Sequence, residues 1–317
     1  MENTEKAATL TGVVAFFVVK DVGTCPPLAD KFLVPPFSVF DTKQGYWQRR
    51  KKEWKEIGLQ SEVGRADSLL GGGLQELCKK QGSNLTGTSV FDPVLCEVVY
   101  NWYSPQHGTV FDPFAGGSVR GVVAEMLGRK YIGIDLSEKQ IDANQMNADK
   151  LGVCPVWYCD DSRNADLYID NETADLLFSC PPYHNLEKYS NHPLDLSNMN
   201  YADFLEAYKE IIATACRKLK QNRFAVWVVG DIRDTKGVYR DFPGVTKRIF
   251  KDNGLQLYNE SILLEQYGTA PMRAGKQFTA KRKVVKVHQL VLVFYKGPPQ
   301  SRGPHRYPRS RRRRQPP

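Results

Sequence analysis

The residues with the clearest chemical potential form the segment Ser179-Cys180-Pro181-Pro182-Tyr183, directly after the apolar run 175–178. An apolar run of this kind predicts a buried strand, and two consecutive prolines cannot continue it because proline has no backbone N–H. The chain must therefore turn out of the sheet here, which leaves Tyr183 at the edge beside carbonyls that have no ladder partner. An aromatic face and a carbonyl acceptor suit a flat ring that carries an amino group. A plain proline turn is the alternative interpretation.

A second group of residues is typical of nucleotide binding. The segment Asp112-Pro113-Phe114-Ala115-Gly116-Gly117-Ser118 follows the apolar stretch 108–111, and glycine lets the backbone approach a ligand closely. Asp135 stands 19 positions after Gly116, at the end of the run 130–135, where a carboxylate can accept from two ribose hydroxyls. Asp160 and Asp161 follow a third apolar run, 156–158, and would either accept from an adenine amino group or cap a helix.

The basic residues are concentrated at one end of the chain. The net charge is +9, yet the stretch from Arg273 to Pro317 contains 14 Lys or Arg and no Asp or Glu, which leaves 30 basic and 35 acidic residues elsewhere. A basic block on a mildly acidic body predicts a polyanionic partner such as nucleic acid. The run Arg311–Arg314 has a second interpretation, as a solubilising tail. Within the loop expected at 265–286, the candidate phosphate contacts are Arg273, Lys276, Lys281, Arg282 and Lys283.

Strands and helices that alternate from about Leu85 would position these residues. The expected strands are 108–111, 130–135, 156–158, 176–178, 224–229, 255–264 and 287–295, and the expected helices are 93–103, 119–127, 137–151, 201–219 and 243–253. Such alternation is typical of a parallel sheet, whose strands all end at one edge. The three acidic loops and the segment 179–183 would therefore meet at that edge.

We predict three parts along the chain. Residues 1–84 form an extension that contains a basic, aromatic helix over 41–55, capped by Asp41. Trp47 and Trp54 of this helix either pack inward or help four consecutive cations to bind phosphates. Residues 85–297 form the main domain, in which the loops 184–200 and 265–286 would contact the target. Residues 298–317 form an Arg/Pro-rich tail expected to be disordered.

Several classes of protein do not fit the composition. The seven cysteines include no C-x-x-C pair or zinc-spaced His/Cys group, so we expect no metal site and reduced thiols in the cytoplasm. The apolar stretch 11–19 is too short to cross a membrane and follows Glu2 and Glu5, so it is interpreted as a strand. We therefore expect no membrane partner.

Two sets of motifs carry a resemblance to a known family. The first set is Phe111-Asp112-Pro113-Phe114-Ala115-Gly116-Gly117, Ile134-Asp135 and Cys180-Pro181-Pro182-Tyr183, which resembles the amino-methylating DNA methyltransferases. The second set is Gln44-Gly45-Tyr46-Trp47-Gln48, Val228-Val229-Gly230-Asp231-Ile232-Arg233-Asp234 and Gln277-Phe278-Thr279-Ala280, which is similar to phage and prophage DNA methylases over about 34–297.

The resemblance implies an α/β fold of the Rossmann-like class I methyltransferase type, with a mostly parallel seven-stranded sheet and helices on both faces. It implies S-adenosylmethionine (SAM) as cofactor and site-specific methylation of the exocyclic amino group of a flipped adenine or cytosine in double-stranded DNA, with or without a cognate restriction nuclease. The implied catalytic residues are Ser179, Cys180, Pro181, Pro182 and Tyr183. The implied cofactor residues are Phe91, Asp92, Asp112, Phe114, Gly116, Gly117, Asp135, Asp160 and Asp161.

Two positions depart from the family pattern. Ser118 stands where the family has the last glycine of its turn, and Cys180 stands where Asp, Asn or Ser is usual. A thiol is a weak hydrogen-bond acceptor, so the choice between adenine and cytosine stays open. The alternatives are an RNA methyltransferase on the same fold and an inactive DNA-binding protein.

Overall fold

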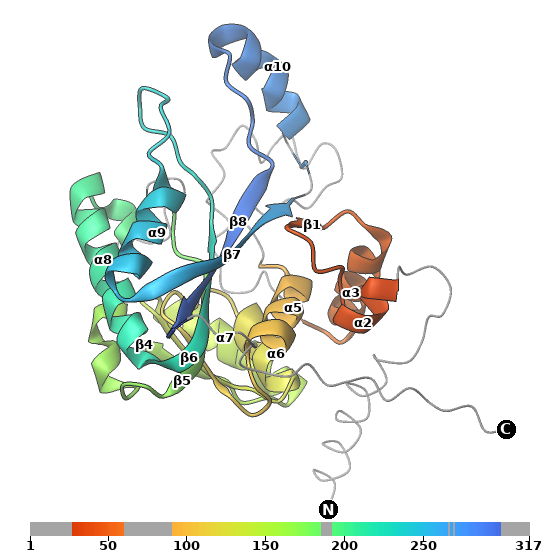
Figure 1. Ribbon diagram of the computed structural model, residues 1–317, viewed down its shortest axis with the longest axis vertical. Helices are drawn as coiled ribbons and strands as arrows, with labels where there is room; N and C mark the ends of the chain where they lie inside the picture. The colour runs from red at the N-terminus through yellow and green to blue at the C-terminus, as the bar shows by residue number, and fades with distance from the viewer. Residues whose placement is uncertain (1–26, 60–90, 185–191, 266, 269, 299–317) are drawn as a thin grey trace, which may run out of the picture.

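The computed structural model describes residues 27–59, 91–184, 192–265, 267–268 and 270–298 (Figure 1). The strands of its sheet are β1 (Val39–Asp41), β2 (Thr109–Asp112), β3 (Lys130–Asp135), β4 (Val156–Cys159), β5 (Ala174–Ser179), β6 (Leu219–Val229), β7 (Leu255–Leu264) and β8 (His288–Lys296). The helices are α2 (Pro27–Phe32), α3 (Gly45–Glu56), α5 (Pro93–Tyr103), α6 (Val119–Met126), α7 (Glu138–Leu151), α8 (Tyr201–Lys218), α9 (Phe242–Asp252) and α10 (Ala270–Lys281), with short 3₁₀ turns η1 (Ser162–Leu167) and η3 (Leu196–Asn198).

The sheet has the order β1-β7-β8-β6-β5-β2-β3-β4, and only β8 runs antiparallel to its neighbours. Helices α3, α5, α6 and α7 cover one face around a core that includes Trp47 and Tyr100, whereas α8 and α9 cover the other around Tyr208 and Trp227. This arrangement confirms the Rossmann-like class I fold. Strand order reverses between β2 and β5, and ligands of open α/β sheets bind at such a reversal.

The sheet has one strand more than expected. Strand β1 comes from the N-terminal extension and pairs in parallel with β7, where Val39 lies opposite Ile262 and Asp41 opposite Leu264. Asp41 therefore ends a strand and does not cap α3: the helix begins at Gly45, and the Asp41 carboxylate accepts from the side chain of Gln44 at 2.9 Å. The segment has only three strand residues and a partner more than 200 positions away, which local patterning cannot reveal.

The expected aromatic helix is α3, and its tryptophans face inward. Trp47 is fully buried and Trp54 nearly so, against α5. Two cations of α3 form ion pairs with α5, Arg50 with Glu97 and Lys51 with Asp92. This packing favours the interpretation in which the tryptophans fix the helix in place.

The expected loop 265–286 contains a helix. The two glycines at 268 and 275 suggested an irregular segment, but 270–281 is α10, which projects from the body where β8 begins (Figure 1). Ala, Met, Arg, Gln and Lys dominate this stretch and have high helix propensity, which outweighs one internal glycine.

Some expectations lie outside the described residues: the strand 11–19, the boundary near residue 84, Tyr189 in the loop 184–200, and the tail from 299. Among the residues that the structure describes, no helix combines the length and apolar character needed to cross a membrane. In the same part of the chain, no three His, Cys, Asp or Glu side chains lie together as a metal would require.

Candidate active site

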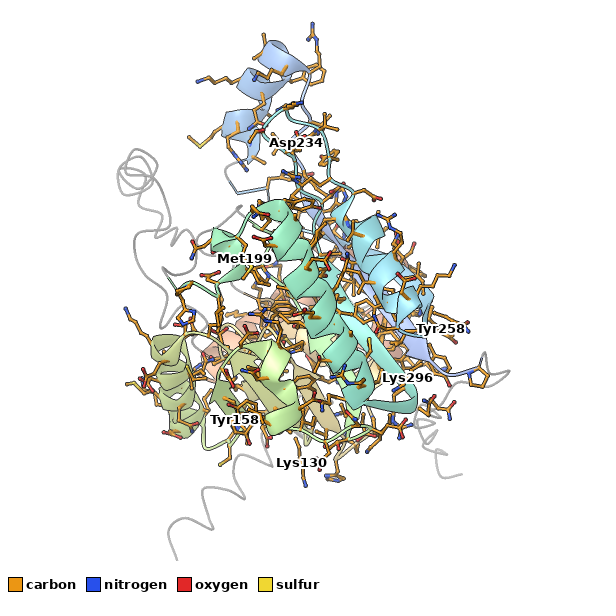
Figure 2. The ribbon with its side chains drawn as sticks, turned by 90° about the vertical axis from the view of Figure 1, so that its left-hand side faces the viewer. Lys130, Tyr158, Met199, Asp234, Tyr258 and Lys296 are labelled. Atoms are coloured by element: carbon orange, nitrogen blue, oxygen red, sulfur yellow. The ribbon has the colours of Figure 1, made fainter. Side chains whose placement is uncertain are left out.

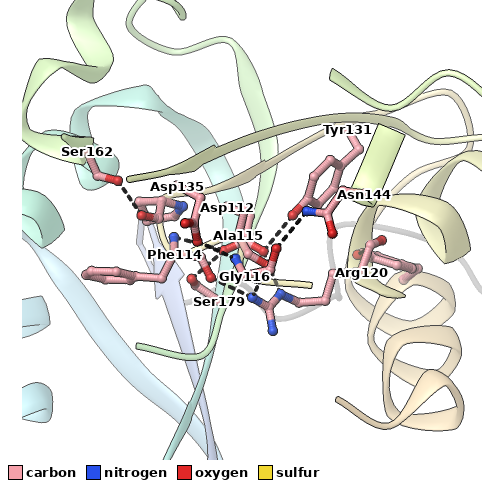
Figure 3. A network of polar contacts seen from close by, with 12 residues as sticks. Asp112, Phe114, Ala115, Gly116, Arg120, Tyr131, Asp135, Asn144, Ser162 and Ser179 are labelled. Carbon is pink, nitrogen blue, oxygen red and sulfur yellow. Dashed lines mark hydrogen bonds and ion pairs between the residues drawn. The ribbon is translucent and has the colours of Figure 1, made fainter. Parts of the chain in front are cut away.

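The centre of the site is Asp112, which is fully buried at the carboxyl end of β2. Its Oδ2 accepts from Arg120 Nε at 2.5 Å and from the Tyr131 hydroxyl at 2.7 Å, and its Oδ1 accepts from the Phe114 N–H at 3.1 Å (Figure 3). Oδ1 also accepts from Ser179 Oγ at 2.5 Å. A buried carboxylate is stable only with such a full set of donors, so Asp112 acts as the anchor of the glycine turn.

Arg120 on α6 completes this network. Its Nη2 donates to the carbonyls of Phe114 and Ala115 at 2.6 and 2.9 Å, and its guanidinium carbon lies 4.5 Å from the centre of the Phe91 ring. Burial alone would lower the pKa of Arg120, but the neighbouring Asp112 carboxylate holds the pKa above its usual range. Arg120 is therefore always positively charged, and its hydrogen bonds fix the backbone of Phe114 and Ala115 in the first half of the glycine turn.

The second half of the turn is fixed by Asp135 and Asn144. The Asp135 Oδ2 accepts from the Gly116 N–H and its Oδ1 from the Ser137 N–H, both at 2.9 Å. The Asn144 side chain donates to the Gly116 carbonyl at 2.7 Å. Gly116 has a φ of 52°, a left-handed conformation that favours glycine, and both Gly116 and Gly117 are partly exposed. Ser118, directly after the two glycines, is buried, and its Oγ accepts from Asn147 at 2.7 Å.

The two acids after β4 have different surroundings. Asp161 accepts from the N–H of Arg163 at 2.9 Å and pairs with the Arg163 guanidinium, so it caps η1. Asp160 accepts from the Tyr168 hydroxyl at 2.7 Å, which lowers the pKa of its carboxyl. The Tyr168 ring stacks on Tyr158 at 4.3 Å between centres. Asp160 is the more exposed acid of the two, beside an aromatic pair.

The segment 179–183 leaves the sheet where β5 ends, next to β2. Ser179 is fully buried, and its bond to Asp112 joins this segment directly to the glycine turn (Figure 3). Pro181 is buried, while Cys180, Pro182 and Tyr183 are partly exposed. The Tyr183 ring lies edge-on to Phe242 at 6.2 Å between centres, and its hydroxyl donates to Gln289 Oε1 at 2.9 Å. Burial raises the pKa of Cys180, so its side chain is a thiol.

The residues before α5 lie close to Arg120 and β5. Phe91 contacts Phe178 edge-on at 5.6 Å between ring centres and lies under Arg120. The Asp92 carboxylate accepts from the Val94 N–H at 2.9 Å and pairs with Lys51 at 2.8 Å, so it caps α5. Phe114 packs against Trp227 at 6.0 Å between centres, on the opposite face of the sheet.

The residues at this edge have the chemistry that SAM requires. Each carboxylate oxygen of Asp135 accepts one hydrogen bond from the backbone of the site. A carboxylate oxygen can accept more than one hydrogen bond, so both oxygens can also accept from the two ribose hydroxyls. Asp135 is half-buried, and desolvation raises the pKa of its carboxyl, so this acceptor gains from further donors. Gly116 and Gly117 carry no side chain above the turn, so a ligand can approach the backbone. Asp160 can accept from the adenine amino group at the end of β4.

The predicted phosphate-contacting residues lie on and after α10. Arg273, Lys276, Lys281 and Arg282 are exposed, and Lys283 is half-buried. Asp234, labelled in Figure 2, lies on the loop between β6 and α9, and a side chain at Gly237 of this loop would meet the Lys283 ammonium after α10. Since α10 joins the end of β7 to the start of β8, it projects from the edge that holds Tyr183.

The sequence analysis missed Arg120, Tyr131 and Asn144. Arg120 interrupts an apolar stretch of α6, and a charge there indicates a buried partner. Gln140, Asn144 and Asn147 recur at helical spacing, which predicts a polar inner face for α7. Glu265 and Gln289 beside Tyr183 had no local signal, because they come from the ends of two later strands.

Comparisons with known proteins agree with this geometry. Residues 45–146 match the model of a family described as DNA methylase, the N6/N4 group. The match runs from the start of α3 into α7 and so includes the glycine turn and Asp135. No curated protein matches the chain.

Solved structures show weaker similarity. TrmN from Thermus thermophilus is 16% identical, with 65% of this chain and 49% of TrmN covered and a TM-score of 0.46, so the chain spans about half of that protein. A TehB-like SAM-dependent methyltransferase from Corynebacterium glutamicum is 16% identical, with 71% and 95% covered and a TM-score of 0.40. A candidate DNA modification methylase, also from Thermus thermophilus, is 15% identical, with 44% and 52% covered and a TM-score of 0.33.

These similarities lie below the level that bears on substrate, and the family model covers residues 45–146. The matched segment contains the turn that would hold SAM, and the Pro-Pro-Tyr segment follows at the adjacent strand end. Over residues 45–146, the chain is similar to the DNA methylases of the N6/N4 group.

Proposed function

We propose that the chain transfers a methyl group from SAM to the exocyclic amino group of an adenine or cytosine that has flipped out of double-stranded DNA. The observation that carries this proposal is the hydrogen bond of 2.5 Å between Ser179 and Asp112. It holds the segment 179–183 against the glycine turn at the strand-order reversal, so a base bound by this segment would meet SAM there. Positioning of this kind supplies much of the rate acceleration in group transfer.

The reaction needs help at the nitrogen, because the lone pair of an exocyclic amine is delocalised into the base. SAM supplies the electrophilic methyl group when it is bound. The Pro181 carbonyl would accept one amino hydrogen, which favours a pyramidal nitrogen with its lone pair available. Tyr183 would stack on the base, and its face would stabilise the positive charge that develops there by about 1–2 kcal/mol when water is excluded.

The remaining residues hold this geometry and the substrate. Asp135 and Asp160 would bind the ribose and adenine of SAM, and Arg120 keeps the turn in shape. The base must leave the duplex to reach a pocket at the sheet edge. The projecting cations Arg273, Lys276, Lys281, Arg282 and Lys283 would contact the phosphates beside it.

The test is methyl transfer from labelled SAM to DNA and to RNA, followed by nucleoside analysis of the product. We expect N6-methyladenine or N4-methylcytosine in DNA with the wild-type chain. Tyr183→Ala should lose at least about 100-fold in kcat while it still binds SAM, since stacking and orientation both depend on the ring. Tyr258→Ala, at an exposed position of β7, is the matched control and should keep full activity.

Two outcomes would change the proposal. If SAM binds and no nucleoside is modified, the methyltransferase activity is rejected and an inactive DNA-binding protein is indicated. If the label appears in RNA alone, the substrate is RNA.

A further inference from the structure

The Tyr183 hydroxyl lies within hydrogen-bond distance of three groups. It is 2.9 Å from Gln289 Oε1, 3.4 Å from the Val228 carbonyl and 3.6 Å from Cys180 Sγ. Gln289 in turn donates from Nε2 to Glu265 Oε1. The four side chains therefore form one continuous chain of hydrogen bonds from Glu265, at the end of β7, to Cys180, at the end of β5.

The donor-to-acceptor direction along this series of hydrogen bonds is determined by groups that can only accept a hydrogen bond. The Glu265 carboxylate accepts, so the amide nitrogen of Gln289 must face it and the amide oxygen must face Tyr183. The Val228 carbonyl is also an acceptor. The hydroxyl hydrogen of Tyr183 is thus directed to carbonyl oxygens on one side, and its oxygen lone pairs face Cys180.

The direction fixes what Cys180 presents to a substrate. Its thiol hydrogen is directed to the Tyr183 oxygen, because that oxygen has no hydrogen left to donate in return. The sulfur then offers lone pairs alone in other directions. A thiol free to rotate would instead point its hydrogen toward an incoming amino group for part of the time, which opposes binding.

On the basis of the proposed function, we propose that Glu265 and Gln289 are positioning residues. They keep the Cys180 thiol in the orientation in which its sulfur accepts a hydrogen bond from the target amino group. Cys180 stands where the family has Asp, Asn or Ser, so a weak acceptor occupies that place. The chain of hydrogen bonds compensates by keeping the sulfur lone pairs oriented. This assigns a role in the reaction to two residues that lie more than 80 positions beyond the Pro-Pro-Tyr segment.

The test compares Gln289→Leu, Tyr183→Phe and the double variant in methyl transfer to DNA. Each single variant should lower kcat about tenfold with unchanged KM for SAM. The double variant should be no slower than either single one, because both remove the same chain. Glu265→Gln should lose about threefold in kcat, since its amide can still turn a carbonyl toward Gln289. Gln256→Leu, at an exposed position of β7, is the matched control.

A Cys180→Asp background separates positioning from a structural effect. A carboxylate accepts in every orientation, so Gln289→Leu should cause no further loss of kcat in that background. An undiminished loss there, or a wild-type kcat for Gln289→Leu alone, would overturn the inference while the methyltransferase stands. A wild-type chain that binds SAM and methylates no DNA would instead overturn the proposed function and this inference with it.

Discussion

Arg120 makes contacts that depend on the planar shape of its side chain. Its guanidinium group bonds Asp112 from one nitrogen, two backbone carbonyls from another, and lies over the Phe91 ring. The two side chains of the ion pair are only 5% and 0% exposed, so neither charge can be satisfied by water. The glycine turn therefore depends on an arginine and not only on positive charge.

Arg120→Lys tests this dependence. A lysine keeps the charge but cannot reach all four partners, so we expect the free energy of unfolding to fall by about 2–4 kcal/mol. Affinity for SAM should fall as well, because the turn loosens. Denaturant unfolding and SAM titration measure the two effects. Arg248→Lys, whose exposed side chain pairs with Asp241, should change neither, and equal values for both variants would contradict this role.

Asp135→Asn tests the acid at the end of β3. The amide can accept only through one atom, so it loses either a backbone N–H of the turn or a ribose hydroxyl. We expect the Kd for SAM to rise at least about tenfold, which corresponds to one hydrogen bond to a charged group. Calorimetric titration with SAM measures the change. Asp142→Asn, exposed on α7, serves as control, and an unaltered Kd for Asp135→Asn would remove this acid from the cofactor site.

At the scale of elements, patterning predicted most of the fold. The glycine turn, the acid after β3 and the strand before Cys180 follow from local residues, because they belong to one repeating strand–helix unit. Strand β1 could not be predicted, since its partner Ile262 lies far along the chain. The network around Asp112 was missed for a similar reason: Tyr131 and Ser179 reach it from two different strands, and their sequences give no sign of it.

Helix α10 presents exposed cations on the side chains of an element that projects beyond the sheet. Arg273 and Lys276 are three positions apart and so share one helix face. We expect Arg273→Gln/Lys276→Gln to weaken DNA binding at all sequences and to lower the slope of log K against log salt by about 2. Lys139→Gln/Lys150→Gln, exposed on α7, is the control. Fluorescence anisotropy over a salt series measures the slope, and equal slopes would place the DNA elsewhere.

At the scale of the whole molecule, the two ends of the parallel strands differ in function. The carboxyl ends of the parallel strands carry the candidate site. At the amino ends of the strands, Asp175 accepts hydrogen bonds from the Thr109 N–H at 3.1 Å and from Lys220 and Arg223 at 2.9 Å each. One carboxylate thus joins β2, β5 and β6 at the end remote from the chemistry.

This carboxylate makes stability depend on pH. Burial would raise the pKa of Asp175, but the bonds from Lys220, Thr109 and Arg223 lower it below its ordinary value of 3.8. A lowered pKa means that the stabilisation is complete above the unfolded pKa and is lost as pH falls through the folded one. At pH 7, Asp175→Asn should cost about 2–3 kcal/mol in the free energy of unfolding.

The difference between wild type and Asp175→Asn should shrink as the pH drops below 3.8. Urea unfolding at several pH values measures it, with Asp170→Asn, an exposed position nearby, as control. A difference that stays constant down to the acid limit would show that the charge of Asp175 is not what joins the strands.

The base of α10 has a consequence for how binding and turnover are linked. The helix is inserted between β7 and β8, so Glu265 lies at one end of its attachment and Gln289 near the other. A duplex that contacted the helix would therefore act on the two strand ends that carry Glu265 and Gln289. Such coupling is reciprocal. If DNA binding stabilises this arrangement of Glu265, Gln289 and Tyr183, then the arrangement raises the affinity for DNA by the same factor. Substitutions at Glu265 should consequently alter the affinity for DNA as well as kcat.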